Sequence, residues 1–270
     1  MTAFVVGDIH GEDWWKAEIF GARDLFEYLR TGDESMYKNF KFLVEDWTKI
    51  VFVGDYVDSF HVSNPDMIDN LKDIIFFARA FPEKVVLLLG NHDIQYIHPK
   101  YQCSGFRPEA YFDLSELFRE NKDLFKAAYL HGNNLISHAG VTQTFWGICE
   151  HQLIKSRELY DYQDPNNTIA DHINFLYESN FGPIFYAGYA RGGSSYYPGI
   201  FWADKFELTR DPLEGYSQVV GHTHIKNKTI VALPDGNSLI FIDAADKPYD
   251  IINTDPNGHT SFPTVRGMNY

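Results

Sequence analysis

The sequence predicts an α/β fold with a mainly parallel inner sheet and a second sheet that is richer in antiparallel pairs. Two observations predict the parallel sheet: short β-branched apolar runs end at polar, glycine-containing loops, and amphipathic helical segments separate the early runs. Two hairpin patterns later in the chain predict the second sheet. The chain has 270 residues, of which 44% are hydrophobic and 22% charged, so disordered and fibrous classes are excluded.

The apolar runs recur in one arrangement before residue 225. They cover residues 3–6, 50–53, 85–89, 135–136 and 218–220. Because helices need longer periodic patterns, runs of this length predict buried strands. Polar side chains therefore collect at strand ends.

Helices are predicted for residues 12–30 and 66–80, where apolar side chains such as Met67, Leu71 and Ile74 recur at helical spacing. The hairpin patterns are apolar segments on either side of a loop that contains glycine and asparagine: residues 127–130 with 135–137, and residues 229–233 with 238–243.

No internal repeat or linker divides the chain, so we interpret residues 1–270 as a single domain. Two segments are predicted to be excursions from it: residues 31–49, which are polar and aromatic, and residues 101–128, which include a helix-like stretch at 114–128. Residues 253–270 have no regular pattern and stay unassigned.

The charge balance limits the classes of partner. Lys and Arg number 23 against 37 Asp and Glu, which gives a formal net charge of -14. This balance argues against nucleic acid and anionic membranes as partners. An anionic substrate would need a local source of positive charge.

The cysteine count and the start of the chain indicate the compartment. Cys103 and Cys149 are the two cysteines, which excludes a disulfide framework and a thiolate zinc site. The start has no secretory signal pattern, and no apolar stretch reaches the roughly 18 residues of a membrane span. We therefore expect a cytoplasmic protein.

The strand-end loops contain side chains that bind metals. They are Asp8 and His10, Asp55 and Asp58, Asn91 and His92, His138, and His222 and His224. Carboxylate, amide and imidazole groups suit divalent manganese, iron or zinc. A single Gly-Asp turn or a lone histidine is an ordinary structural feature, but turn chemistry does not require these histidines. The ordered set predicts a metal site with mixed nitrogen and oxygen ligands.

In this order the motifs Asp-x-His, Gly-Asp-x-x-Asp, Gly-Asn-His-Asp, a later His and Gly-His-x-His resemble those of the calcineurin-like metallophosphoesterase superfamily, and they span residues 7–224. The resemblance implies a four-layer αββα sandwich of two mixed β-sheets with two divalent metal ions at the strand ends. It also implies residue roles: Asp8, His10 and His224 on the first metal, Asn91, His138 and His222 on the second, Asp55 bridging both, His92 as the catalytic histidine, and Asp58 orienting it.

Within the superfamily, residues 54–58 (Gly-Asp-Tyr-Val-Asp) and 137–140 (Ser-His-Ala-Gly) resemble the branch of Ser/Thr phosphoprotein phosphatases and symmetrical diadenosine tetraphosphatases. That branch usually continues with Arg-Gly, whereas Ser59 and Phe60 follow here, and its Gly-Asn-His-Glu is Gly-Asn-His-Asp. The arginine that would help to bind the substrate phosphate is missing from its usual place.

Two other arginines are candidates for phosphate binding, because a guanidinium can bind two phosphate oxygens at once. Arg191 lies in Tyr-Ala-Arg-Gly-Gly, in the stretch where phosphatases of this branch carry a phosphate-binding arginine. Arg107 follows the catalytic loop, although helix capping or a surface ion pair explains it as well. Nearby aromatic residues, including Tyr196, Tyr197, Phe201 and Trp202, could line a substrate surface, although most of the aromatic content is expected to belong to the core.

These observations predict a dinuclear-metal-dependent phosphoester hydrolase, a phosphomonoesterase of the phosphoprotein-phosphatase kind, which uses a metal-activated hydroxide. His92 would protonate the leaving group. The expected substrate is a phosphoprotein or a small phosphoester or nucleotide, and the expected metals are manganese, iron, zinc or magnesium. A nucleoside polyphosphate hydrolase of the diadenosine tetraphosphate type is the alternative enzyme. A non-catalytic metal-binding scaffold would typically lack a ligand or the catalytic histidine, and all of them are present here.

Overall fold

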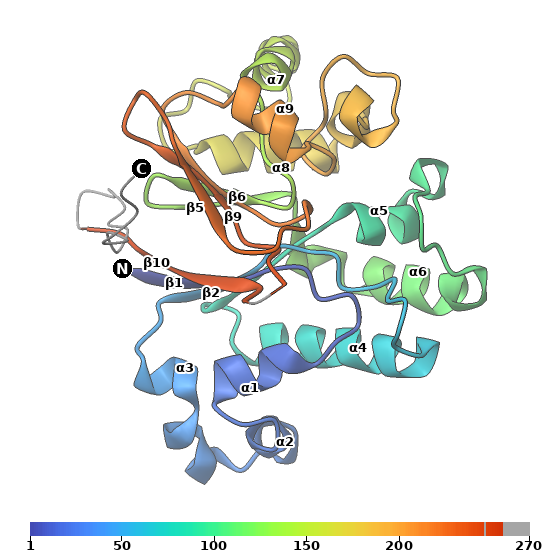
Figure 1. Cartoon of the computed structure of the whole chain (residues 1–270), viewed down its shortest axis with the longest axis vertical. Coiled ribbons are helices and arrows are strands. Elements are labelled where there is room, and N and C mark those ends of the chain that lie inside the picture. The colour runs from blue at the N-terminus through green and yellow to red at the C-terminus, as the bar shows by residue number, and fades with distance from the viewer. Residues whose placement is uncertain (246, 256–270) are drawn as a thin grey trace.

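In the computed structural model, two β-sheets stack on each other and helices cover their outer faces (Figure 1). The structure describes residues 1–245 and 247–255. The first sheet has the order β10-β1-β2-β3-β4. Its strands are β1 (Thr2–Val6), β2 (Lys49–Phe52), β3 (Val85–Leu88), β4 (Phe125–Lys126) and β10 (Tyr249–Asn253). β1 to β4 pair in parallel and β10 runs antiparallel to β1, so the predicted mainly parallel sheet is confirmed.

The second sheet has the order β5-β6-β7-β9-β8. Its strands are β5 (Ala128–His131), β6 (Asn134–Ser137), β7 (Ser217–Val220), β8 (Thr229–Ala232) and β9 (Ser238–Phe241). The two predicted hairpins are present as the antiparallel pairs β5/β6 and β8/β9. The central pairs β6/β7 and β7/β9 are parallel, so the sheet is mixed. Among the described residues, two of its four strand pairs are antiparallel against one of four in the first sheet, so it is richer in antiparallel pairs, as predicted. The long helical crossover between β6 and β7 returns the chain in the same direction.

The helices form the outer layers. Those associated with the first sheet are α1 (Trp14–Phe20), α2 (Leu25–Thr31), α3 (Lys41–Val44), α4 (Asn64–Ala80), α5 (Asn91–Ile97) and α6 (Tyr111–Glu120). Those on the second sheet are α7 (Gln143–Lys155), α8 (Ile169–Glu178) and α9 (Lys205–Arg210). Short 3-10 turns cover Glu34–Asn39, Pro99–Tyr101, Pro108–Ala110, Lys122–Leu124, Gly182–Phe185 and Tyr189–Arg191.

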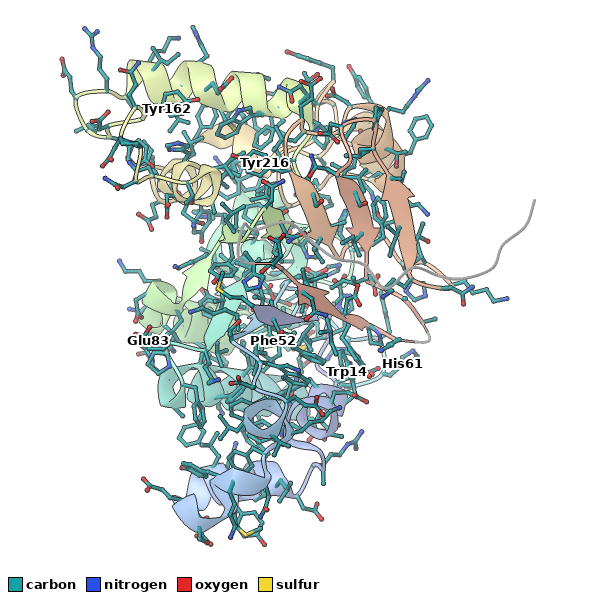
Figure 2. The ribbon with its side chains drawn as sticks, turned by 90° about the vertical axis from the view of Figure 1, so that its left-hand side faces the viewer. Trp14, Phe52, His61, Glu83, Tyr162 and Tyr216 are labelled. Atoms are coloured by element: carbon teal, nitrogen blue, oxygen red, sulfur yellow. The ribbon has the colours of Figure 1, made fainter. Side chains whose placement is uncertain are left out.

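Alternate strand residues face different layers. Ala3 and Val5 of β1 form one buried cluster with Val219 of β7 and other aliphatic residues of both sheets, which fills the space between the sheets. Phe52 of β2, labelled in Figure 2, faces the helices. Its ring lies 5.6 Å from that of Trp15 in α1. The predicted four-layer αββα sandwich is therefore confirmed.

The predicted helix at 12–30 is divided in two. Gly21 has φ 94°, a left-handed conformation that glycine adopts without strain, and its N–H donates to the Ala17 carbonyl at 2.8 Å. This αL C-cap stops α1 and lets α2 start in a new direction. Helical periodicity alone does not reveal such a break.

Other segments also differ from the expectation. The helix-like stretch at 114–128 stops at Glu120, and residues 125–126 form β4 instead. β10 was not predicted, because it lies directly before the unassigned tail. Residues 256–270 of that tail lie outside the part of the chain that the structure describes.

The excursion at 31–49 contributes to the core. Its aromatic residues Phe40 and Phe42 are fully buried, and both pack on Phe20 of α1 at ring distances of 4.9 and 5.5 Å. Across residues 1–245 and 247–255, none of the helices combines the length and the apolar character that crossing a bilayer requires.

Trp15→Ala tests the aromatic core under the first sheet. Trp15 is fully buried and its Nε1 donates to Asn70 Oδ1 at 3.0 Å. We expect the free energy of unfolding to fall by about 3–5 kcal/mol, because the substitution leaves a large cavity. Urea unfolding followed by circular dichroism measures this. Phe112→Ala, at a side chain 81% exposed, is the control and should change stability by less than about 0.5 kcal/mol. Equal stability of both variants would contradict the prediction.

Candidate metal centre

The predicted ligands meet where the parallel strands end. β1, β2 and β3 are parallel neighbours, and so are β6 and β7, so the loops that follow them lie side by side. Asp8, His10 and Asp55 form one group whose ligand atoms lie within 4.8 Å of one another, and Asp55, His138 and His222 form another. Asp55 belongs to both groups.

Glycines allow the loops to approach this closely. A Cβ on Gly54, where φ is 102°, would lie 2.2 Å from the backbone nitrogen of Gly90. A Cβ on Gly90 would lie 2.1 Å from Asp55 Oδ1, and one on Gly221 would lie 2.1 Å from Asp8 Oδ1. Space therefore requires glycine at all three positions, and at Gly54 the positive φ favours it as well.

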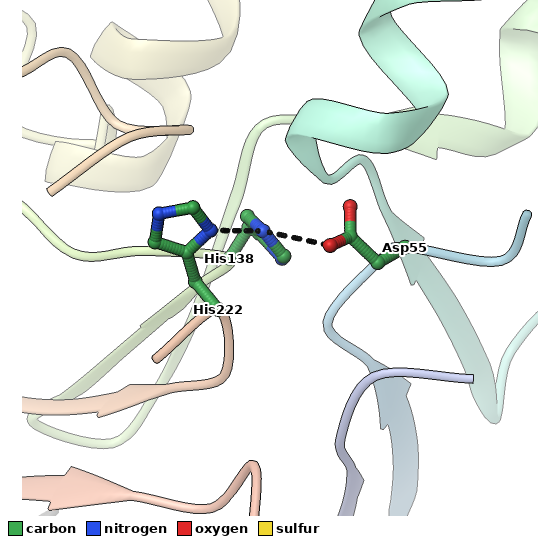
Figure 3. A group of neighbouring side chains, drawn as sticks. All are labelled: Asp55, His138 and His222. Carbon is green, nitrogen blue, oxygen red and sulfur yellow. Dashed lines mark hydrogen bonds and ion pairs between the residues drawn. The ribbon is translucent and has the colours of Figure 1, made fainter. Parts of the chain in front are cut away.

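Asp55 lies at the centre of the site. Its Oδ1 accepts a hydrogen bond from the His92 backbone N–H at 2.9 Å. Its Oδ2 lies 3.4 Å from His138 Nε2 and 3.9 Å from His10 Nε2. Figure 3 shows His138 between Asp55 and His222. One carboxylate thus faces imidazoles that come from both sheets.

Backbone carbonyls orient two of the histidines. His10 Nδ1 donates to the Val57 carbonyl at 3.0 Å, and His138 Nδ1 donates to the Val53 carbonyl at 3.1 Å. Because a carbonyl only accepts, the ring hydrogen of each neutral histidine lies on Nδ1, and Nε2 presents its lone pair to Asp55. Such contacts are how proteins orient histidines that bind metals.

The arrangement of the remaining atoms fits a bound cation. His138 Nε2 lies 2.9 Å from Asn91 Oδ1 and 3.1 Å from His222 Nδ1. His222 Nε2 is buried and has no hydrogen-bond partner among residues 1–245 and 247–255. Lone pairs of nitrogen and oxygen that face one another in a buried site are favourable when a cation lies between them.

The pKa shifts of Asp55 and His138 suit metal ligands, whereas that of Asp8 favours the neutral acid, which a bound cation would reverse. Burial raises the pKa of Asp8 well above its usual value, and the carboxylates of Asp243 and Asp55 add to this rise. Burial works in the same direction on Asp55, but the surrounding histidines, His138 first, bring its pKa below the usual value. Burial lowers the pKa of His138 to about 4. An ionised Asp55 next to a neutral His138 is the state in which both groups bind a metal.

His92 and Asp58 form a pair at the edge of this site. His92 Nδ1 donates to Asp58 Oδ2 at 3.0 Å. Burial opposes the charged imidazole, but Asp55 and the hydrogen bond to Asp58 raise the pKa of His92 to about 12. A cation bound to Asp55 would compensate the negative charge of that carboxylate. In a metal-loaded site, the hydrogen bond to Asp58 would then be the main contribution that raises the pKa of His92.

The sequence analysis missed the residues that hold Asp58. Gln95 Nε2 donates to Asp58 Oδ2, and the Tyr96 hydroxyl donates to Asp58 Oδ1 at 2.5 Å. Both lie on α5, one turn after His92. Their spacing from His92 is a helical signal that could have identified them, since residues three and four positions apart share a helix face.

Asp93 also has a role that the sequence analysis did not assign. Its carboxylate is fully buried and accepts hydrogen bonds from the backbone N–H groups of Asp55, Tyr56 and Gly90 at 2.8–2.9 Å. It therefore ties the loop after β2 to the loop after β3.

His224 is less enclosed than the other predicted ligands. Its side chain is 72% exposed and belongs to neither ligand group, and its Nδ1 lies 3.5 Å from Asp243 Oδ2. Asp243 was missed because no glycine precedes it, although it follows strand β9 in the same way. Because this contact involves Nδ1, Nε2 is the His224 nitrogen that remains to bind a metal.

The two candidate arginines have different surroundings. Arg191 Nε lies 3.0 Å from Asp204 Oδ2, and one of its terminal nitrogens donates to Thr223 Oγ1 at 2.8 Å. The Arg107 guanidinium donates instead to the Val62 carbonyl and to the Asn64 side chain, and it does not line the cavity described below.

A cavity of about 1450 Å³ opens over the site. Asp8, Asp55 and His92 line it together with Arg191 and Cys103. The predicted aromatic residues Tyr196, Tyr197 and Trp202 also line it, whereas Phe201 is fully buried in the core.

Comparisons with known proteins agree with this site. Residues 1–226 match the family model described as calcineurin-like phosphoesterase. A stretch of 105 residues is 32% identical to a candidate serine/threonine-protein phosphatase of Schizosaccharomyces pombe and covers 39% of this chain and 26% of that protein. A stretch of 145 residues is 27% identical to a PP2A-like serine/threonine-protein phosphatase of Candida albicans and covers 51% of this chain and 29% of that protein. The matched stretches span less than a third of these relatives.

Among solved structures, the chain is similar to a mutant of a cold-active protein tyrosine phosphatase. The TM-score is 0.52 at 16% sequence identity, and the match covers 96% of this chain and 79% of that chain. This similarity shows that the two share a fold.

Asp55→Asn is expected to lower the occupancy of both metal positions, because one anionic ligand would be lost from two cations at once. Elemental analysis after dialysis against manganese measures the metal bound per chain. Asp69→Asn, at a side chain 69% exposed on α4, is the matched control and should bind as much metal as the wild type. Two metals per chain in Asp55→Asn, with turnover close to normal, would contradict a bridging role.

Proposed function

The chain belongs to the calcineurin-like phosphoesterase family, and we propose on that basis that it is a dinuclear-metal-dependent hydrolase of phosphate monoesters. The observation that supports this best is Asp55, whose carboxylate is shared by two groups of ligand atoms. A carboxylate that binds two cations fixes their separation, which is what two-metal phosphoester hydrolysis requires.

The proposed ligands are divided between two positions. Asp8, His10 and His224 would bind one divalent cation, Asn91, His138 and His222 would bind the other, and Asp55 would bridge them. Bound cations would neutralise charge on the phosphate and lower the pKa of an attacking water. These oxygen and nitrogen ligands accept manganese, iron, zinc or magnesium, so metal availability decides which is bound.

His92 is the proposed proton donor to the leaving oxygen. Because its Nδ1 donates to Asp58, Nε2 is the nitrogen available to a substrate in the cavity. Asp58 keeps the imidazole oriented, and Gln95 and Tyr96 prevent Asp58 from turning away. A donor of this kind is useful where the leaving alkoxide would otherwise be strongly basic.

Arg191 is the proposed phosphate-binding side chain. Its contacts with Asp204 and Thr223 hold it at the cavity wall, and Thr223 lies between the two proposed ligands His222 and His224. A guanidinium fixed in this way can bind phosphate oxygens that the cations do not contact, and it adds to the positive charge that the cations would supply.

Turnover of p-nitrophenyl phosphate tests the proposed function. We expect release of nitrophenol that depends on added manganese and stops when a chelator removes the metal. Absence of turnover with manganese, iron, zinc and magnesium would favour a non-catalytic metal-binding scaffold. Faster hydrolysis of diadenosine tetraphosphate than of any monoester would favour the nucleoside polyphosphate alternative.

His92→Asn is expected to slow hydrolysis of alkyl phosphates by about 10²–10⁴-fold, and hydrolysis of aryl phosphates with acidic phenols much less. A good leaving group needs the proton least. Single-turnover rates for the two substrate types measure the chemical step directly.

The matched control for this variant is His151→Asn, at an exposed histidine of α7, which should hydrolyse both substrates at the wild-type rate. Metal content is measured in parallel, because a disturbed Asn91 would slow both substrates equally. Equal losses at full metal occupancy would rule out proton donation by His92.

Arg191→Ala is expected to weaken inhibition by phosphate or vanadate by about tenfold to a hundredfold while metal content stays unchanged, since a charge-assisted hydrogen bond is lost. Inhibition constants at fixed manganese measure this effect. Arg119→Ala, at an exposed arginine of α6, is the control. Unchanged inhibition would mean that Arg191 does not bind the phosphate, and Arg107→Ala would then be tested in the same way.

A further inference from the structure

An exposed aromatic side chain stands on a rigid turn next to the proposed proton donor. Phe60 lines the cavity and is 80% exposed. Asp58, two residues earlier, is buried and bonded to His92. Ser59 is buried as well, and its Oγ accepts hydrogen bonds from the backbone N–H groups of His61 and Val62 at 3.1 and 3.0 Å. The turn is therefore held at both ends, while the Phe60 ring has solvent around most of its surface.

A second segment contributes further aromatic side chains to the same cavity. Tyr196 is 71% exposed, and its ring packs at 4.8 Å against Tyr197, which is nearly buried. The ring of Tyr186 also packs against Tyr197, with the ring centres 6.3 Å apart. All three line the cavity. Tyr197 thus supports two tyrosines that a ligand can reach.

The charges of the cavity favour a ligand with a single phosphate. Lys100 and Arg191 are the lysine and arginine side chains in its lining, and Arg191 is paired with Asp204. A polyphosphate chain would need more positive charge than these two side chains provide once the metals have bound one phosphate.

We propose that the site prefers phosphate monoesters of aromatic alcohols, with Phe60 and Tyr196 contacting the ring of the leaving group. This inference rests on the proposed phosphatase function. Phe60 and His92 line the same cavity, and the backbone of Phe60 is two residues, at most about 7 Å, from that of Asp58, which holds His92. A ring bonded directly to the phosphate oxygen would occupy the part of the cavity next to His92. The alkyl group of an alkyl phosphate offers no flat surface for stacking. In a nucleotide, the sugar separates the base from the phosphate.

Phosphonates test this inference without any turnover, because their carbon–phosphorus bond is not an ester. Isothermal titration of the manganese-loaded protein compares phenylphosphonate with methylphosphonate. We expect phenylphosphonate to bind about tenfold more tightly, and Phe60→Ser and Tyr196→Ser each to remove most of this preference. Phe112→Ser, at an equally exposed phenylalanine outside the cavity lining, is the matched control and should keep the preference.

Two results would overturn the inference. One is equal affinity for the two phosphonates, or a preference that survives in both Phe60→Ser and Tyr196→Ser. The other is adenosine monophosphate binding more tightly than phenylphosphonate in a manner that depends on Phe60, which would assign the aromatic side chains to a nucleobase. If no phosphate ester is hydrolysed but the phosphonate preference still depends on Phe60, the proposed function fails and the aromatic site stands.

Peptide substrates distinguish a phosphorylated protein from a small aryl phosphate as the natural substrate. A phosphotyrosine peptide and a phosphoserine peptide of the same sequence are compared with free phosphotyrosine by kcat/KM. A higher kcat/KM for the phosphotyrosine peptide than for free phosphotyrosine would indicate a protein substrate. A higher kcat/KM for free phosphotyrosine would indicate a small aryl phosphate. Faster turnover of the phosphoserine peptide through a lower KM would contradict the proposed preference.

Discussion

The buried carboxylate of Asp93 holds the site together. It accepts three backbone hydrogen bonds, from Asp55, Tyr56 and Gly90, and these bonds connect the ends of the two neighbouring strands β2 and β3. Without them the loop after β2 would have unpaired N–H groups in the protein interior, which is costly. The position of Asp55, and with it the spacing of any bound cations, depends on a residue that contacts neither a proposed metal nor a substrate.

The loop after β2 then orients side chains from other elements. The carbonyls of Val53 and Val57 fix the rings of His138 and His10, which come from different sheets, and the Asp55 carbonyl accepts hydrogen bonds from the backbone of residues 9 and 10. Glycines at the adjacent strand ends provide the space. The six residues from 53 to 58 therefore contribute more to the geometry of the site through their backbone than through their side chains.

Sequence reasoning predicted most of the strands, though not β4 or β10, and the proposed ligands, because these produce strong local signals. A short apolar run before a Gly-Asp or Gly-His pair is readable from adjacent residues alone. The break at Gly21, the strand β10 and the contact between His224 and Asp243 depend on tertiary packing, which no local pattern contains. The contacts of Gln95 and Tyr96 with Asp58 are an intermediate case. Helical spacing places both residues on the same face of α5 as His92, but the position of Asp58 next to that face comes from tertiary packing.

The pairing of β10 with β1 has a consequence for synthesis on the ribosome. β1 is translated well before residues 249–253, which pair with one of its edges. The hydrogen bond from the His222 backbone N–H to the Asp8 carboxylate likewise joins positions 214 residues apart. Until β10 has been translated, β1 has an open edge that other chains could pair with. A nascent chain of this protein would therefore need protection of that edge, by a chaperone or by fast translation up to β10, more than a protein in which each strand pairs with its neighbours in sequence.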